Sequence, residues 1–288
     1  MNETQKPAER PSDAELKALS DSFEAQQPWD VLKYALKTYE GRIVLACSFG
    51  AEDVALVDMV HRIDPEAPLF YLDTDFLFAE TFDVRDRIVA RYGLKPAQVI
   101  QMKSLLTPEQ QAAQHGAALW ASKPDQCCEL RKIEPLTRIL GRYGAWITGI
   151  RRDQAPTRAN AGLIEWDKKF NLVKVNPLAK WSSEQVWTYI QLHEVPYNIL
   201  HDRNYPSIGC THCTAPVLPG DDPRSGRWKN FGKTECGLHK SPSKSACGLA
   251  RLLPALHSLP APTNWILSPV MWRLRICLLP AAPPITSS

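Results

Sequence analysis

Short apolar segments alternate with amphipathic segments along most of this chain, and this alternation constrains the fold more than any other feature. Five segments rich in β-branched and aromatic residues have the length of buried strands: 42–47, 68–72, 98–101, 145–150 and 171–175. Helical spacing of apolar residues marks 79–92, 128–140 and 182–193, and residues 1–40 read as a helical lead-in. The pattern predicts an α/β fold whose doubly wound, mostly parallel sheet has helices on both faces.

Composition and charge exclude several classes of protein. With 44% apolar and 23% charged residues, the chain has the profile of an ordinary soluble protein. Its first twenty residues lack the apolar core of a secretory signal, and no uninterrupted apolar stretch is long enough to span a membrane, so we expect a cytoplasmic protein without membrane contact. Residues 241–288 hold four basic and no acidic residues. Removing those four from the 34 Lys and Arg leaves 30 against 31 Asp and Glu, which argues against nucleic acid as a partner.

Polar motifs follow the first two predicted strands. Parallel strands end at the same edge of a sheet, where doubly wound folds bind their ligands. The motif SFGAED at 48–53 lies between a strand and a helix and can present a hydroxyl and backbone N–H groups to an anion, although a simple helix start explains it as well. The second strand ends in carboxylate and hydroxyl groups that could bind ribose or adenine; a helix cap is the alternative. The candidate binding residues here are Ser48, Gly50, Glu52, Asp53, Leu72, Asp73 and Thr74.

Two further motifs carry arginines. The strand at 145–150 leads into Gly149, Arg151 and Arg152, and a loop rich in Gly and Pro carries Arg224 and Arg227. Guanidinium groups match the oxygens of phosphate and sulfate, so both loops are candidates for binding an anion. A solvated basic loop is the alternative.

The cysteines indicate metal or thiol chemistry. In a reducing compartment, clustered cysteines are more often metal ligands or nucleophiles than disulfides. Cys127 and Cys128 are adjacent, and Cys210 and Cys213 form a CxxC pair. Adjacent cysteines suit separate irons of a [4Fe–4S] cluster better than one tetrahedral ion, yet zinc with His212, or four unconnected thiols, stay open. The Lys and His that flank Cys236 favour a nucleophilic thiol there, against a surface cysteine.

These motifs together resemble the assimilatory sulfonucleotide reductases, above all the bacterial adenylyl-sulfate (APS) reductases that use thioredoxin. The resemblance covers about residues 40–241 and includes SFGAED, YLDTD, CCELRK, TGIRRDQAPTR, the CxxC pair and ECGLH. It implies a sheet of the adenine nucleotide α-hydrolase (PP-loop) type and a [4Fe–4S] cluster on the four cysteines. It also implies that Cys236 attacks the sulfur of APS and that thioredoxin then releases sulfite. Adenosine would meet the first two motifs, and the phosphosulfate Lys132, Arg151, Arg152, Arg224 and Arg227, with His239 also at the substrate.

The expected organisation follows from this resemblance and from composition. We expect a nucleotide- and cluster-binding domain at 41–219, a mobile catalytic lid at 220–241 and a disordered, Pro-rich tail at 242–288. Three alternatives remain: a reductase acting on 3′-phosphoadenosine 5′-phosphosulfate (PAPS), an iron–sulfur tRNA thiolase of the PP-loop type, and a zinc-stabilised binding module without catalysis. A homo-oligomer is compatible with the sequence.

Overall fold

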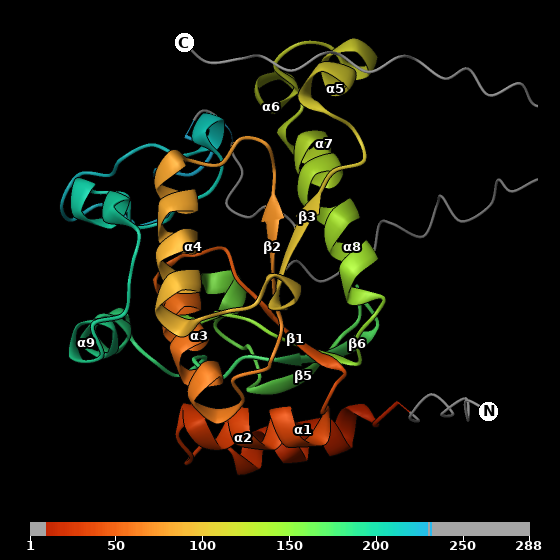
Figure 1. Cartoon of the computed structure of the whole chain (residues 1–288), viewed down its shortest axis with the longest axis vertical. Coiled ribbons are helices and arrows are strands. Elements are labelled where there is room, and N and C mark those ends of the chain that lie inside the picture. The colour runs from red at the N-terminus through yellow and green to blue at the C-terminus, as the bar shows by residue number, and fades with distance from the viewer. Residues whose placement is uncertain (1–9, 230, 232–288) are drawn as a thin grey trace, which may run out of the picture. The chain divides into compact units, whose positions relative to one another are not determined.

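The computed structural model describes residues 10–229 and 231, all of which fall in one compact unit (Figure 1). The strands of this part form one sheet of six in the order β3-β2-β1-β4-β6-β5. Their bounds are β1 Ile43–Ala46, β2 Leu69–Asp73, β3 Val99–Lys103, β4 Ala145–Ile147, β5 Ile164–Asp167 and β6 Leu172–Val175. Five of them overlap the strands predicted from the sequence, which confirms the α/β class.

The sheet is parallel except at one edge. β1, β2, β3, β4 and β6 run in the same direction, with Leu45 of β1 opposite Leu69 of β2 and Ile147 of β4. β5 pairs antiparallel with β6. The chain builds outward from β1 through β2 to β3 and then returns to place β4 on the other side of β1. This reversal makes the carboxyl ends of β1 and β4 the switch point, where such sheets bind ligands.

Helices cover both faces of the sheet because side chains of each strand alternate between them. In β1, Ile43 and Leu45 enter the larger apolar core, whereas Val44 enters the smaller one. The larger core receives the apolar faces of α1 (Asp13–Ser22), α2 (Pro28–Thr38), α3 (Ala51–Ile63), α4 (Ala79–Tyr92) and α9 (Ser183–Leu192). The smaller core is closed by α8 (Glu134–Leu140), which Figure 1 shows across the sheet from α3 and α4.

Local signals explain where the helices begin and end. In its described part, residues 10–40, the predicted lead-in forms two helices, and Pro28 occupies the first turn of α2. Ser12 with Glu15, and Ser182 with Gln185, form capping boxes at the starts of α1 and α9. α4 ends at Gly93, whose φ of +60° suits glycine best.

The segment between β3 and β4 is more broken than the sequence predicts. It contains α5 (Pro108–His115), α6 (Leu119–Ser122), α7 (Pro124–Cys128) and a π-helical turn at Glu129–Ile133 before α8. The helix predicted at 128–140 is therefore confirmed as helical, with a π turn inside it. Short 3₁₀ turns occur at Pro96–Gln98, Arg152–Gln154, Pro156–Arg158, Ile199–Arg203 and Thr211–Cys213. Across the residues that the structure describes, we find no helix with both the length and the apolar character of a membrane span.

Candidate active site

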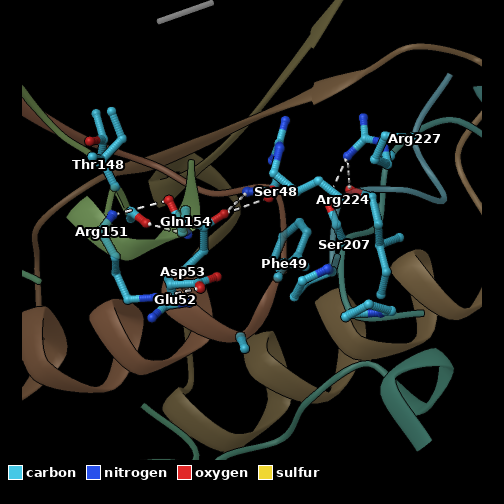
Figure 2. Close-up of a pocket in the computed structure, with 18 of the residues that line it drawn as sticks. Ser48, Phe49, Glu52, Asp53, Thr148, Arg151, Gln154, Ser207, Arg224 and Arg227 are labelled. Atoms are coloured by element: carbon cyan, nitrogen blue, oxygen red, sulfur yellow. Dashed lines mark hydrogen bonds and ion pairs between the residues drawn. The ribbon is translucent and has the colours of Figure 1, made fainter. Parts of the chain in front are cut away.

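A cleft of about 1070 Å³ lies over the carboxyl ends of β1 and β4. The loops that follow β1, β2 and β4 line it, and residues 206–209 and 222–229 close it from the opposite side. Figure 2 shows Ser48 and Phe49 in the middle of this site, with Thr148, Arg151 and Gln154 on one side of them and Arg224 and Arg227 on the other. The cleft therefore has two halves, which we call the Arg151 half and the Arg227 half.

Ser48 is tied to the first turn of α3. Its backbone N–H and its hydroxyl both donate to Asp53 Oδ2, each at 2.6 Å. Burial raises the pKa of Asp53 to about 6, and the two hydrogen bonds from Ser48 oppose this rise. Because both donors of Ser48 are used within the protein, the hydroxyl faces the cleft as an acceptor. The sequence suggested that Ser48 offers its donors to an anion, and the structure does not place them for that.

Gly149 lets the β4 loop approach the start of α3. A Cβ atom at Gly149 would lie 2.4 Å from Asp53 Oδ1 and 2.8 Å from Glu52 Cβ, distances that real side chains do not tolerate. The loops after β1 and β4 are therefore packed against each other at the switch point. Gly50, Glu52, Asp53 and Gly149 all line the cleft, as the sequence predicted for this edge of the sheet.

Arg151 enters the cleft between carboxylates. Its guanidinium is buried, its Nε donates to Glu52 Oε1 at 2.9 Å, and its Nη1 donates to Asp153 Oδ2 at 2.6 Å. Its backbone N–H donates to Gln154 Oε1 at 3.0 Å, which fixes the turn. Figure 2 shows Arg151 close to Glu52 and Gln154.

Two predicted binding residues lie elsewhere. Arg152 is not among the residues that line the cleft, because its guanidinium pairs with Glu24 at 2.5 Å and its Nε donates to the Ala161 carbonyl. Asp73 is also absent from the lining, although Leu72 and Thr74 are part of it. Gln101 Nε2 donates to the buried Asp73 carboxylate at 2.5 Å, so that Asp73 joins β2 to β3.

The Arg227 half of the cleft is cationic. Arg227 is 9% exposed, and its Nη1 donates to Ser207 Oγ and to the Ile208 carbonyl, both at 3.2 Å. Its guanidinium lies 4.5 Å from the centre of the Trp228 ring. A Cβ atom at Gly209 would lie 2.3 Å from this guanidinium, so glycine makes room for it. Arg224 and Lys132 also line the cleft.

The four predicted ligand cysteines line one small cavity beside the Arg227 half, and Lys132 lines both this cavity and the cleft. Burial, and after it the charges of the other three cysteines, raise the pKa of Cys127 to about 12. Thr74 Oγ1 lies 3.3 Å from Cys210 Sγ, which joins the end of β2 to the cavity. Within residues 10–229 and 231, no three His, Cys, Asp or Glu side chains are grouped as one metal ion requires.

Some predictions fall outside the described residues, and some cleft residues were not predicted. Cys236 and His239 lie outside the described residues, as do residue 230, residues 232–241 and all of 242–288. Cys47 is 3% exposed, which confirms its interpretation as a buried apolar residue. The cleft is also lined by residues that were not among the predicted site residues: Thr148, Gln154, Arg158, Trp187, Tyr197, His201 and Ser207. Three of these, Thr148, Gln154 and Arg158, belong to the arginine motif at 148–158, which was the available signal.

The part of the chain that forms most of this site matches a known protein family. The model of the phosphoadenosine phosphosulfate reductase domain matches residues 42–216, which include the loops after β1, β2 and β4 and the four cysteines. The chain belongs to this family. Its relatives include the adenosine 5′-phosphosulfate reductase of Halalkalibacterium halodurans, 48% identical over 77% of this chain and 95% of the relative. The corresponding protein of Shouchella clausii is 52% identical over 75% of this chain and 88% of its own.

Other members carry a different substrate in their names. The phosphoadenosine 5′-phosphosulfate reductase of Gloeobacter violaceus is 45% identical over 78% of this chain and 93% of its own. The crystal structure of phosphoadenylyl-sulfate (PAPS) reductase from Candida auris, a phosphate complex, superposes with a TM-score of 0.63 at 30% identity, covering 72% of this chain and 98% of that one. This superposition confirms that the chain has the α/β fold of the reductase family.

Proposed function

We propose that this protein reduces adenosine 5′-phosphosulfate to sulfite and AMP in sulfate assimilation. Relatives of 48% and 52% identity bear the name of this activity. The observation that carries the proposal is the position of Lys132, which lines both the cleft at the switch point and the cavity of the four cysteines. The cleft is large enough for a nucleotide, and its cationic half lies beside the cysteine cavity. This arrangement suits the binding of a dianionic phosphosulfate close to the cysteines.

The reaction proceeds in two displacements at sulfur. The thiolate of Cys236 attacks the sulfur of APS, a new S–S bond forms, and the bond between sulfur and the phosphate oxygen breaks, so that AMP leaves with the electron pair. The product is S-sulfocysteine, Cys–S–SO₃⁻. One thiolate of reduced thioredoxin then attacks the Cys236 sulfur and releases sulfite, and its second thiol resolves the mixed disulfide. Thioredoxin supplies the two electrons and is oxidised to its disulfide.

The cations of the cleft make the first displacement feasible. The oxygens of a sulfate group repel an incoming thiolate, and positive groups fixed around these oxygens remove that repulsion. Arg227 is held by Ser207 and Ile208 before any ligand arrives, so little reorganisation is needed when the substrate binds. Lys132 would stand between the phosphosulfate and the cysteines. Burial raises the pKa of Cys213 to about 11, and the charge of Lys132 opposes this rise.

The proposal includes a [4Fe–4S] cluster on Cys127, Cys128, Cys210 and Cys213. Four thiols that face one cavity are the donor set such a cluster takes, one cysteine to each iron. When bound, the cluster supplies positive charge to the thiolates and structural and electrostatic support beside the substrate. Burial first, and then repulsion from the neighbouring cysteines, raise the pKa of Cys127 and Cys213, and bound iron would offset this by binding the deprotonated thiols. We expect the cytoplasm as its compartment, because clustered thiols persist where the environment is reducing.

PAPS is the second candidate substrate, because a relative of 45% identity and the Candida auris structure are named for it. It would undergo the same chemistry, with a 3′-phosphate on the nucleotide. Reduction of APS and reduction of PAPS differ in whether the cleft must accommodate a 3′-hydroxyl or a 3′-phosphate on the nucleoside.

A direct assay tests the proposed function. The full chain, purified without oxygen, is mixed with APS and reduced thioredoxin, and sulfite is measured. We expect turnover in the wild type, loss of turnover in Cys236→Ser, and, with APS alone, the added mass of one SO₃ group on the peptide that contains Cys236. Turnover by Cys236→Ser at the wild-type rate would exclude the mechanism.

A further inference from the structure

The two halves of the cleft differ in charge. The Arg227 half presents Lys132, Arg224, Arg227 and Lys229, and Asp222 is a carboxylate in the same loop as Arg224; Asp202 also lines the cleft. The Arg151 half presents the guanidinium groups of two arginines to the carboxylates of Glu52, Asp53 and Asp153. Positive charge therefore dominates one half, and carboxylates outnumber cations in the other.

This asymmetry orients a nucleotide that carries an anionic group at its 5′ end. The phosphosulfate takes the Arg227 half, next to Lys132 and the cysteine cavity, because the cations are there. The nucleoside is left with the Arg151 half, where Ser48 offers an acceptor for a hydroxyl or amino group. Figure 2 shows the two halves on opposite sides of Ser48.

Within the nucleoside half, the charge of Arg151 is already neutralised. Its Nε and Nη1 face Glu52 and Asp153 at 2.9 and 2.6 Å. The Arg151 side chain is 8% exposed and that of Glu52 21%, so water screens this pair weakly, whereas the pair with the half-exposed Asp153 is screened more. Arg158 Nη1 donates to Gln154 Oε1 at 2.5 Å on the same side. A guanidinium that holds two carboxylates has little charge left to attract another anion.

We propose that Glu52 and Asp153 are specificity-determining residues, which neutralise Arg151 and so favour a nucleotide with a free 3′-hydroxyl over one with a 3′-phosphate. A 3′-phosphate adds about 1.5 to 2 negative charges, by analogy with a phosphate monoester on a side chain. In the Arg151 half these charges meet three carboxylates, whereas a hydroxyl meets acceptors to which it can donate. This inference rests on the proposed function and deepens it, because it assigns the choice between APS and PAPS to named side chains.

Binding of unreactive nucleotides tests the inference without catalysis. AMP and adenosine 3′,5′-bisphosphate are titrated calorimetrically into the full-length wild type, Glu52→Gln and Asp153→Asn. Both substitutions keep the size of the side chain and an oxygen that accepts from Arg151, and the Asp153 side chain is 48% exposed, so that replacing it does not disturb the core. We expect each variant to shift the ratio of the two dissociation constants about 10-fold toward the bisphosphate, which is the effect of freeing part of one charge.

The arginine next to Arg151 in the chain provides a matched control. Glu24 pairs with Arg152, outside the cleft, so Glu24→Gln removes a carboxylate from an arginine pair of the same kind and should leave the ratio unchanged. The inference is overturned if the wild type binds the bisphosphate more tightly than AMP, or if neither Glu52→Gln nor Asp153→Asn changes the ratio. A protein that discriminates as expected but makes no sulfite from APS would instead contradict the proposed function alone.

Discussion

Replacing Gly149 by alanine tests the packing at the switch point most directly. The added methyl carbon would lie 2.4 Å from Asp53 Oδ1 and 2.8 Å from Glu52 Cβ. Neither neighbour can withdraw easily, since Asp53 accepts two hydrogen bonds from Ser48 and Glu52 pairs with Arg151. Gly149 is not among the glycines with positive φ, so the expected cost comes from this contact and not from the backbone.

The cost can be estimated from overpacking in other cores. One extra carbon forced into a filled site destabilises by about 1–3 kcal/mol, which for a protein of this size lowers the melting temperature by about 2–10 °C. Relief of the clash moves the loop after β4 away from α3, and a displacement near 1 Å at a binding site can lower kcat/KM about 100-fold. We therefore expect a moderate loss of stability and a larger loss of activity.

Urea unfolding and the sulfite assay measure the two effects separately, with Gly141→Ala as the control. Gly141 ends α8 with ordinary helical dihedrals, and a Cβ atom there would meet its nearest neighbour at 3.4 Å, so this variant should keep the stability and activity of the wild type. Wild-type activity and stability in Gly149→Ala would refute the close contact between the β1 and β4 loops.

Three further predictions concern individual side chains. Arg227→Met should lower kcat for APS about 100- to 1000-fold, as loss of one oxyanion donor does, and a rise in KM alone would contradict its role in the transition state. The pKa of Asp53 is raised, so the folded protein binds the proton of this carboxyl more tightly than the unfolded chain does. Asp53 therefore contributes favourably to the stability of the fold below pH 3.8, its unfolded pKa, and this contribution is lost as the pH rises through about 6. Asp53→Asn should therefore melt higher than the wild type at pH 7.5 and lose this advantage at pH 4, as calorimetry can show. Cys210→Ser should lower bound iron and the visible absorbance of anaerobically purified protein, whereas unchanged iron content would exclude Cys210 as a ligand.

The sequence predicts the centre of this fold better than its edges, for a physical reason. Strands that are buried on both faces, such as β1, need uninterrupted apolar residues, and that pattern is visible in the sequence. β5 is an edge strand of sequence IEWD with one buried residue, so it lacks the pattern and was missed. Helices α5 to α7 are short and depend on contacts with the cysteine region, which periodicity does not report.

The candidate site shows the same limit at the level of single residues. Arg151 and Arg152 are adjacent and chemically identical, and the sequence assigned both to the substrate. In the structure one guanidinium meets Glu52 in the cleft, and the other meets Glu24, which lies between α1 and α2. The choice depends on which carboxylate the fold brings near each arginine, and those partners are 99 and 128 residues away in the chain.

The π turn at Glu129–Ile133 is the clearest case in which local geometry outside the reach of sequence patterns creates the site. A π turn inserts a residue into an α-helix and changes the direction of the side chains after it. Two consecutive basic residues of this turn have different environments: Arg131 is 1% exposed and donates to Asp75 at 2.7 Å, whereas Lys132 lines both the cleft and the cysteine cavity. Arg131 anchors the turn to the end of β2, and that anchor holds Lys132 between the cleft and the cysteine cavity. The connection between the cleft and the cysteine cavity therefore runs through a helical irregularity, and a regular helix at the same residues would direct these side chains differently.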